Sequence, residues 1–288
     1  MKMTQLYQDV EVTVKELAPN FSPPHRHNFF ELIYVLEGNG IHRINNNNFN
    51  YSKGNVFLLT PEDSHTFKSG IPAKFCIIDF TKNFLSKSNF QKPDRAEVSD
   101  FFIRLEYVFH NHHNIKGDII ANESDRKLMD ILFLQLVAEK ENRRIFQEII
   151  TQNIVFLLLH IVVRNIQQGI ASNFRQENPK NKVHEITAYI QQNIYNKELI
   201  KIEKIAEQFN KSADHLSRYF KKQTGITMKD YIIQYKLNLI KTRLTYSDLT
   251  ISEIAHEMNF TDESHLNKLF KNHYGKTVSQ FKKEVLLK

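Results

Sequence analysis

The sequence predicts an α+β protein, with an all-β N-terminal segment followed by helices to the C-terminus. Through residues 1–82, short runs rich in β-branched and aromatic residues alternate with turn residues. From residue 94 onward, apolar residues recur every three or four positions, which is the spacing of one helix face. The C-terminal part also repeats a pattern of helix, tight turn and second helix. We therefore expect three parts, residues 1–82, 83–172 and 173–288.

The N-terminal segment is expected to form a β-sandwich or barrel. Its predicted strands are residues 11–17, 29–36, 40–44, 55–60 and 73–80. Many short strands separated by Pro, Gly and Asn favour this architecture over a parallel α/β sheet. The Asn45–Asn48 run predicts a hairpin loop, because asparagine tolerates a positive φ.

The middle segment is expected to be helical and to bury a broad apolar surface. Its predicted helices are residues 99–109, 125–140 and 145–166. The third is apolar over more than one stripe, and its run 154–163 is too short to span a bilayer. Such a helix must be covered, either by neighbouring segments or by a second copy of the chain. We expect a homodimer formed through the apolar faces of 125–140 and 145–166, with Leu158 and Ile161 at the interface. Gly169 and the polar residues after it predict a helix stop and a linker.

Charge and cysteine content limit the location and the partners. The chain has 288 residues and a net charge of +7; residues 179–288 hold 19 Lys and Arg against 12 Asp and Glu, whereas residues 1–178 hold 20 of each. A basic part attached to a neutral part indicates a polyanion, nucleic acid first and an anionic membrane second. With only Cys76 and no apolar signal segment at the N-terminus, the protein is expected to be cytoplasmic.

The repeat aligns residues 202–227 with residues 251–277. Asn210 and Asn259 occupy the position that ends a first helix in the left-handed conformation. The residues suited to cap the second helices are Ser212 in one copy and Thr261 with Asp262 in the other. Two apolar pairs, Leu216 with Phe220 and Leu266 with Phe270, would face the core, and Gly225 and Gly275 would end the helices.

The other face of each second helix is polar and basic. This arrangement is that of a helix-turn-helix whose second helix enters the major groove of DNA. A single copy could equally be an amphipathic helix with a solvated charged face. Because both copies share the polar face and lie in the basic part of the chain, we expect double-stranded DNA as a partner.

Residues 182–288 resemble the DNA-binding domain of the AraC/XylS family of transcription regulators, including the ends FKK-x-x-G and FKN-x-x-G of both second helices. The resemblance implies seven helices, with a long helix at about 228–245 between the two motifs. It implies base contacts by Asp214, Ser217, Arg218, Ser264, His265 and Lys268. It implies backbone contacts by Lys221, Lys222 and Lys271, and RNA polymerase as a partner of an activator. Val278, Lys282 and Lys236 depart from the family's usual Pro, Arg and Arg.

The stretch PHRHNFFELIYVLEG, residues 24–38, contains two histidines and a glutamate that could share a site with His65. Alternating histidines on a strand point to the same side. The spacing of His25, His27, Glu31 and Gly38 resembles the metal motif of the cupin barrel, and Gly54, Pro61 and His65 meet its second motif in part. In cupin enzymes these positions hold a metal, and in the regulators the barrel commonly binds a sugar or another small polar effector.

Several interpretations of this cluster are open. The favoured one is a metal-free effector pocket formed by His25, His27, Glu31 and His65. We expect no cofactor, although the same four side chains would also suit a divalent metal. The chain could instead be a metal-dependent cupin enzyme with an accessory basic domain, or a constitutive dimeric DNA-binding protein without an effector. We expect that the protein is not an enzyme. A separate group, the histidines 110, 112 and 113, would suit either a metal site or the end of a helix.

Overall fold

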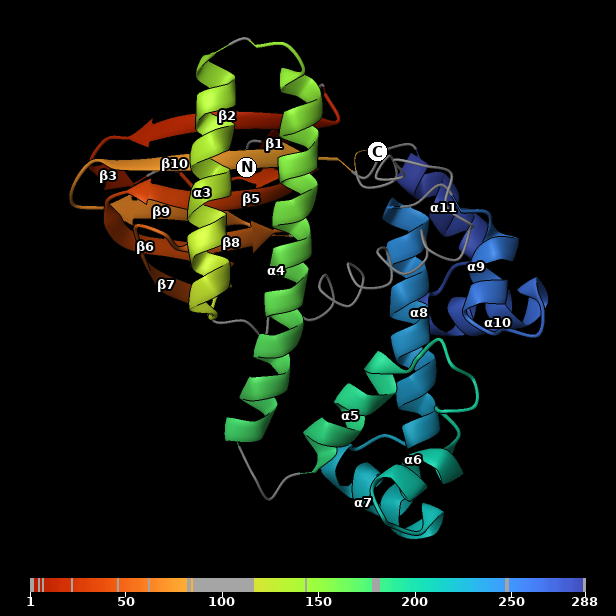
Figure 1. Ribbon diagram of the computed structural model, residues 1–288. Coiled ribbons are helices and arrows are strands. Elements are labelled where there is room, and N and C mark those ends of the chain that lie inside the picture. The colour runs from red at the N-terminus through yellow and green to blue at the C-terminus, as the bar shows by residue number, and fades with distance from the viewer. Residues whose placement is uncertain are drawn as a thin grey trace. The chain divides into compact units, whose positions relative to one another are not determined.

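The structure is a computed structural model that describes residues 3–4, 6, 8–21, 23–45, 47–61, 63–81, 84, 117–142, 144–177, 182–246 and 249–286. The chain divides into two compact units, Met1–Ser172 and Asn173–Lys288. The first contains the sheets, and in the second the elements formed by the described residues are all helices (Figure 1). The α+β prediction is confirmed.

Two four-stranded antiparallel sheets form the first unit. One has the order β2 (Val10–Leu17), β10 (Ala73–Phe80), β5 (Phe30–Glu37), β8 (Val56–Leu59). The other has the order β3 (Asn20–Phe21), β9 (His65–Ser69), β6 (Asn39–Ile44), β7 (Asn47–Ser52). A short parallel pair, β1 (Met3–Thr4) with β4 (Arg26–His27), adds to them.

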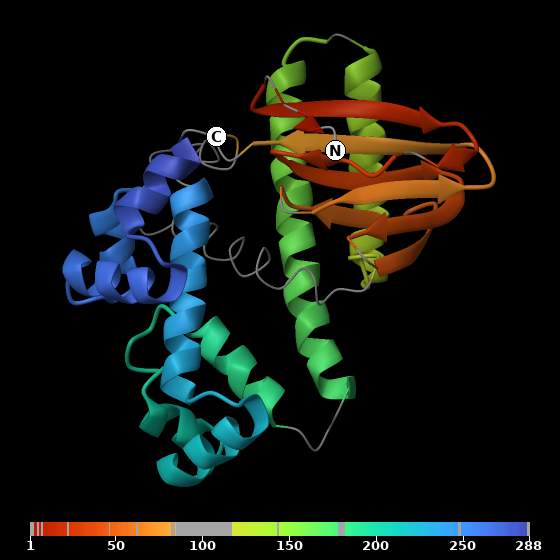
Figure 2. The ribbon, with the colours of Figure 1, turned by 180° about the vertical axis from the view of Figure 1, so that it is seen from behind.

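The core of this unit explains the continuous apolar run in β5. Six successive residues from Phe30 to Val35 are buried, so both faces of the strand are covered. On one face Ile33 and Val35 belong to an apolar cluster of the two sheets. On the other, Tyr34 stacks on Phe133 of a helix, α3, that lies over the sheet (Figures 1 and 2). A strand buried on both faces loses the polar alternation of a solvated strand.

Besides three two-residue strands, two longer strands were not expected from the sequence because their composition is polar. β7 reads NNFNYS and β9 reads HTFKS, and both pair with β6. Backbone pairing with an established strand overrides weak local preference. Asn45 has the expected positive φ of 54°, but the asparagine run then enters β7 at Asn47, so the predicted loop is shorter than expected.

Two long helices, α3 (Glu123–Glu141) and α4 (Gln147–Glu177), follow the sheets. They confirm the predicted helices at 125–140 and 145–166. The predicted stop at Gly169 is wrong, because a glycine inside a helix costs only about 1 kcal/mol relative to alanine and α4 continues through it. The predicted helix 99–109 and the histidines 110, 112 and 113 lie outside the described residues.

The packing of α4 corrects one expectation. Leu158 and Ile161 are buried within the chain, so they cannot form a dimer interface. The sequence shows the helical period but does not show which stripe faces the sheets. The apolar run 154–163 lies in a longer segment, Gln147–Ile166, that is long and apolar enough to span a membrane, with a mean hydropathy of 1.7. It is 56% buried, and Asn165 and Arg164 bond to Asp125 of α3, which is the packing of a core helix.

Among its described residues, the second unit contains seven helices after the end of α4, as the family resemblance implies. They are α5 (Val183–Gln192), α6 (Ile202–Gln208), α7 (Ala213–Thr224), α8 (Met228–Tyr246), α9 (Ile251–Glu257), α10 (Glu263–Tyr274) and α11 (Val278–Leu286). Phe220 of α7 and Phe270 of α10 are buried in one core together with Leu237 and Ile240 of α8. The long helix α8 therefore joins two helix-turn-helix motifs, α6–α7 and α9–α10, through a shared apolar core.

Candidate functional site

Three strands bring the predicted histidines and the glutamate together. His27 ends β4, Glu31 lies in β5, and His65 begins β9. His25 is tied to His65 by two backbone hydrogen bonds of 3.2 Å. His27, Glu31 and His65 are buried and His25 is half-buried. All four predicted cluster residues therefore converge.

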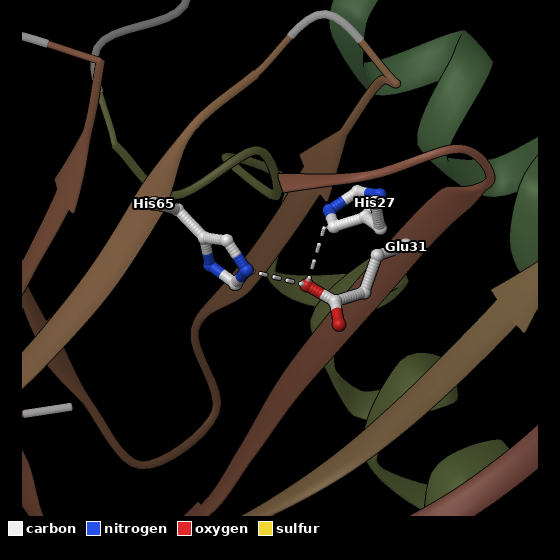
Figure 3. A group of neighbouring side chains, drawn as sticks. All are labelled: His27, Glu31 and His65. Carbon is white, nitrogen blue, oxygen red and sulfur yellow. Dashed lines mark ion pairs between the residues drawn. The ribbon is translucent and has the colours of Figure 1, made fainter. Parts of the chain in front are cut away.

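One carboxylate oxygen of Glu31 lies between the imidazoles of His27 and His65 (Figure 3). Its Oε2 is 3.3 Å from His65 Nε2 and 3.9 Å from His27 Nε2. His65 Nε2 is also 3.0 Å from His25 Nε2. The ligand atoms of His27, Glu31 and His65 all lie within 4.8 Å of one another, a separation that suits a single ion.

Backbone carbonyls fix the tautomers of two histidines. His27 Nδ1 is 2.6 Å from Phe29 O, and His25 Nδ1 is 3.3 Å from Pro23 O. A carbonyl only accepts, so each Nδ1 donates and each neutral ring directs its Nε2 lone pair toward the cluster. Burial lowers the pKa of both imidazoles and favours their neutral form. Among the described residues, His27 Nε2 and Glu31 Oε2 are buried without a hydrogen-bond partner.

His42 and Asp79 belong to the same cluster, and neither was expected from the sequence. His42 Nε2 is 3.1 Å from His65 Nδ1, and burial lowers the pKa of His42 to about 3. Asp79 of β10 lies opposite Glu31 in the sheet. Burial raises the pKa of Asp79 to about 7, and burial together with Asp79 raises that of Glu31. Alternation along 40–44 could have indicated His42, but the register that pairs Asp79 with Glu31 is not readable from sequence.

The donor set fits a divalent transition metal. Neutral imidazole nitrogens and a carboxylate oxygen are the ligands that zinc, nickel and manganese accept in proteins. Histidines that ligate a metal commonly donate their other ring N–H to a backbone carbonyl, as His25 and His27 do. Of the four expected residues, His27, Glu31 and His65 lie close enough together to hold the ion, His25 contacts His65 Nε2, and His42 would orient His65.

The two helix-turn-helix motifs have the predicted local geometry. Asn210 and Asn259 have positive φ values of 52° and 57°. Ser212 caps α7 by accepting from His215 N, and Asp262, rather than Thr261, caps α10 by accepting from His265 N. Both helices end at left-handed glycines, Gly225 and Gly275. The polar caps and glycines therefore explain both helix boundaries.

The nine residues proposed from the resemblance to contact DNA lie on α7 and α10, facing away from the shared core. Eight are exposed and Ser217 is half-buried; they are Asp214, Ser217, Arg218, Lys221, Lys222, Ser264, His265, Lys268 and Lys271. Arg218 and Asp214 form an ion pair one turn apart, with each side chain 76% exposed.

The residues that depart from the family pattern face inward. Lys236 Nζ donates to Met258 O at 2.7 Å, and Lys282 Nζ donates to Leu249 O at 2.7 Å. Val278 is fully buried. These two lysines thus bond backbone carbonyls of their own unit.

Comparison with known proteins identifies both units. A family model described as an AraC-like ligand binding domain matches residues 13–114, and one described as a helix-turn-helix domain matches residues 205–284. The HTH-type transcriptional activator RhaS of Yersinia pseudotuberculosis serotype I (strain IP32953) is 24% identical over 280 residues, covering 95% of this chain and 94% of the relative. RhaS of Yersinia pestis (strain Pestoides F) matches with the same identity and coverage.

Two solved structures are similar to part of the chain. The C-terminal domain of AraT, a response regulator from Geobacillus stearothermophilus, is 25% identical over 35% of this chain and 84% of that chain, with a TM-score of 0.34. A transcriptional regulator with an AraC-type DNA-binding domain from Chromobacterium violaceum is 23% identical over 36% of this chain and 91% of that chain, also with a TM-score of 0.34. On the two family models and the full-length relatives, the chain belongs to the AraC family and is a DNA-binding transcription regulator.

Proposed function

We propose that this regulator is a cytoplasmic transcriptional activator that reads DNA with α7 and α10 and responds to a small ligand bound in its N-terminal unit. The DNA contacts are proposed from the exposed polar face on both helices, which lie within the basic part of the chain. Activation is proposed from the relatives, which are named as activators. An activator also requires RNA polymerase as a partner.

Genome-wide mapping of bound DNA, combined with a reporter, tests this function. The intact chain should occupy a limited set of promoters, and transcription from them should fall when the gene is deleted. A matched chain carrying Arg218→Ala and Lys268→Ala should lose these sites. Occupancy without a change in transcription would contradict activation, and no reproducible sites would contradict sequence-specific binding.

The ligand site that we propose is the cluster of His25, His27, Glu31 and His65. Buried polar atoms without partners are costly unless a ligand satisfies them. His27 Nε2 and Glu31 Oε2 are such atoms. A small polar molecule with hydroxyl groups, such as a sugar, could donate to the lone pairs of both.

A divalent metal at the same four side chains is the second candidate, and one observation favours it. Two imidazoles have tautomers fixed by carbonyls, so that the lone pair of His27 faces Glu31 Oε2 and that of His25 faces His65 Nε2. Metal analysis of the purified protein, followed by thermal unfolding with Zn²⁺, Ni²⁺ or Mn²⁺ and with a sugar panel, separates the two. Stabilisation by an ion that chelation reverses supports the metal, and stabilisation by a sugar in chelator supports the metal-free pocket.

An enzyme and a constitutive DNA-binding protein would each give a different result in the same assays. A metal-dependent enzyme would turn over a substrate whether or not DNA is present, and we propose no catalytic role. A constitutive DNA-binding protein would show no ligand that stabilises the first unit. Its promoter occupancy would also be the same under every growth condition.

We further propose a homodimer formed through the exposed apolar side chains of α3, α4 and the turn between them. Ile131, Leu134, Ile145, Phe146 and Ile149 are between 52% and 81% exposed. Apolar side chains gathered on one part of a surface indicate a partner. They replace Leu158 and Ile161, which are buried within the chain.

A further inference from the structure

The two helix-turn-helix motifs differ in what holds their turns. Asn210 and Asn259 are equivalent left-handed residues. The side chain of Asn259 donates to Tyr195 O at 2.9 Å, and Tyr195 lies between α5 and α6, beside the other motif. The side chain of Asn210 has no such bond within the described part of the chain. The second turn is thus attached to the half of the unit that contains the first motif.

Helix α8 adds two buried cations to this attachment. Lys236 and Arg243 are seven residues apart, which is two helical turns, so they lie on the same side of α8. Lys236 Nζ donates to Met258 O at 2.7 Å. Arg243, 1% exposed, pairs with Glu257, donates to the Tyr195 hydroxyl at 3.2 Å and stacks over its ring. Both cations therefore hold the C-terminal end of α9.

Removing one partner of these contacts should be costly, because it would leave a buried charge without its partner. The carbonyl of Met258 is at the end of a helix, where carbonyls lack intrahelical partners. The first motif has Gln208 and Phe209 at the positions equivalent to Glu257 and Met258. Of the equivalent residues Gln208 and Glu257, only Glu257, in the second motif, supplies an acidic side chain for Arg243.

We propose that Tyr195, Lys236, Arg243, Glu257 and Asn259, here called the inter-motif hub, set the angle and distance between α7 and α10. The hub thereby fixes how many base pairs separate the two half-sites that one chain reads. A turn held rigidly to α8 fixes the direction of α10, which starts four residues after Asn259. This inference rests on the proposed roles of α7 and α10 in base contact.

Spacing selectivity provides the test, because a merely structural role would not change it. Each inserted base pair moves one half-site by about 3.4 Å and rotates it by roughly a tenth of a turn. DNA is first selected from a random library with the intact wild-type chain. Operators with one or two base pairs inserted or removed between the half-sites are then compared.

Because the two motifs repeat, each of two hub variants in the second motif has a matched control in the first. Asn259→Gly keeps a residue suited to positive φ and removes the bond to Tyr195. Its control, Asn210→Gly, makes the same change in the first turn. Glu257→Gln removes the partner of Arg243, and Glu207→Gln near the end of α6 makes the same change at a surface pair with Lys204. Tyr195→Phe removes only the hydroxyl and serves if a variant fails to fold.

The wild type and both controls should lose roughly tenfold or more in affinity for each altered base pair of spacing, the scale of one mismatch. The hub variants should lose less than about threefold, with base preference inside each half-site unchanged. The inference would be overturned if the hub variants lost affinity by the same factor at every spacing, or if they kept the spacing selectivity of the wild type. If the wild type selects no sequence at all, the proposed DNA contacts fail instead.

Discussion

At the scale of single residues, Arg218 and Lys271 should have different roles on DNA. Arg218 can bridge two acceptors of a guanine, whereas Lys271 would contact phosphate. Arg218→Ala should cost about 1–3 kcal/mol and relax the preference at one base position. Lys271→Ala should weaken all sequences alike and reduce the salt slope by about one. Binding selection with each variant checks this, and an unchanged base preference for Arg218→Ala would contradict the assigned role.

Lys236 makes the stability of the second unit depend on pH. Burial lowers its pKa from 10.5 to about 8. Between these pH values the unfolded chain binds more protons than the folded chain, so Lys236 makes stability rise with pH in this window. Below about pH 8 the buried charge of Lys236 lowers the free energy of unfolding, and this destabilisation disappears as the pH rises toward 10.5.

The comparison with Lys236→Met isolates this effect from other titrating groups. The wild type should gain up to about 3 kcal/mol over the variant between pH 7 and pH 10. Chemical unfolding of the intact chain at both pH values measures the difference. A gap between wild type and variant that is the same at both would show that Lys236 is not titrating there.

The histidine cluster should control regulation without affecting DNA contacts, because it lies in the other compact unit. Replacing both His27 and Glu31 with Ala should abolish the ligand response of a reporter promoter. The affinity of the variant for DNA in the absence of ligand should stay within about twofold of the wild type, since no proposed DNA contact changes. A reporter that still responds would exclude this cluster as the ligand site.

Spacing in the sequence was sufficient to place His25, His27 and Glu31 together, and the partial match to the second cupin motif added His65. It was insufficient for His42 and Asp79. Their place depends on which strands are neighbours and in which register, as with Asp79 opposite Glu31. Sheet register comes from long-range packing.

At the scale of elements, local chemistry determined the helices of the second unit more completely than the strands of the first. Capping residues and left-handed Asn and Gly mark the ends of α7 and α10 in the sequence itself. β7 and β9 have no such local signal and form by pairing with β6. The period of α4 was predicted, but its buried side was not, since that depends on the sheets.

The exposed face of α3 and α4 leads to a prediction about assembly. Ile131 is 64% exposed and Phe146 is 69% exposed. The double change Ile131→Asp and Phe146→Asp should yield a folded monomer, because it places charge only on the proposed interface. Sedimentation at micromolar concentration, with circular dichroism as the check on folding, measures this.

Leu158→Asp is the contrasting variant. Leu158 is fully buried, so an aspartate there should unfold the first unit instead of separating two copies. A wild-type chain that sediments as a monomer would contradict the proposed dimer. A folded monomer from Leu158→Asp would return the interface to the stripe first expected from the sequence.

At the scale of the whole molecule, charge and function divide along the same boundary. The second unit holds the excess of positive charge and both helix-turn-helix motifs, and the first holds the buried cluster. Sequence alone predicted this division, because the repeat and the charge imbalance are local properties. It could not predict that α4 continues to Glu177, past the division of the units after Ser172.

The most direct test of this account measures binding of the intact chain to its selected DNA as salt is raised. Displaced counterions should make the logarithm of affinity fall linearly with the logarithm of salt, with a slope near −0.9 for each phosphate contacted. Arg218→Ala and Lys268→Ala together should remove preference for the selected sequence over random DNA. Selection of no sequence by the wild type, or an affinity independent of salt, would contradict the account.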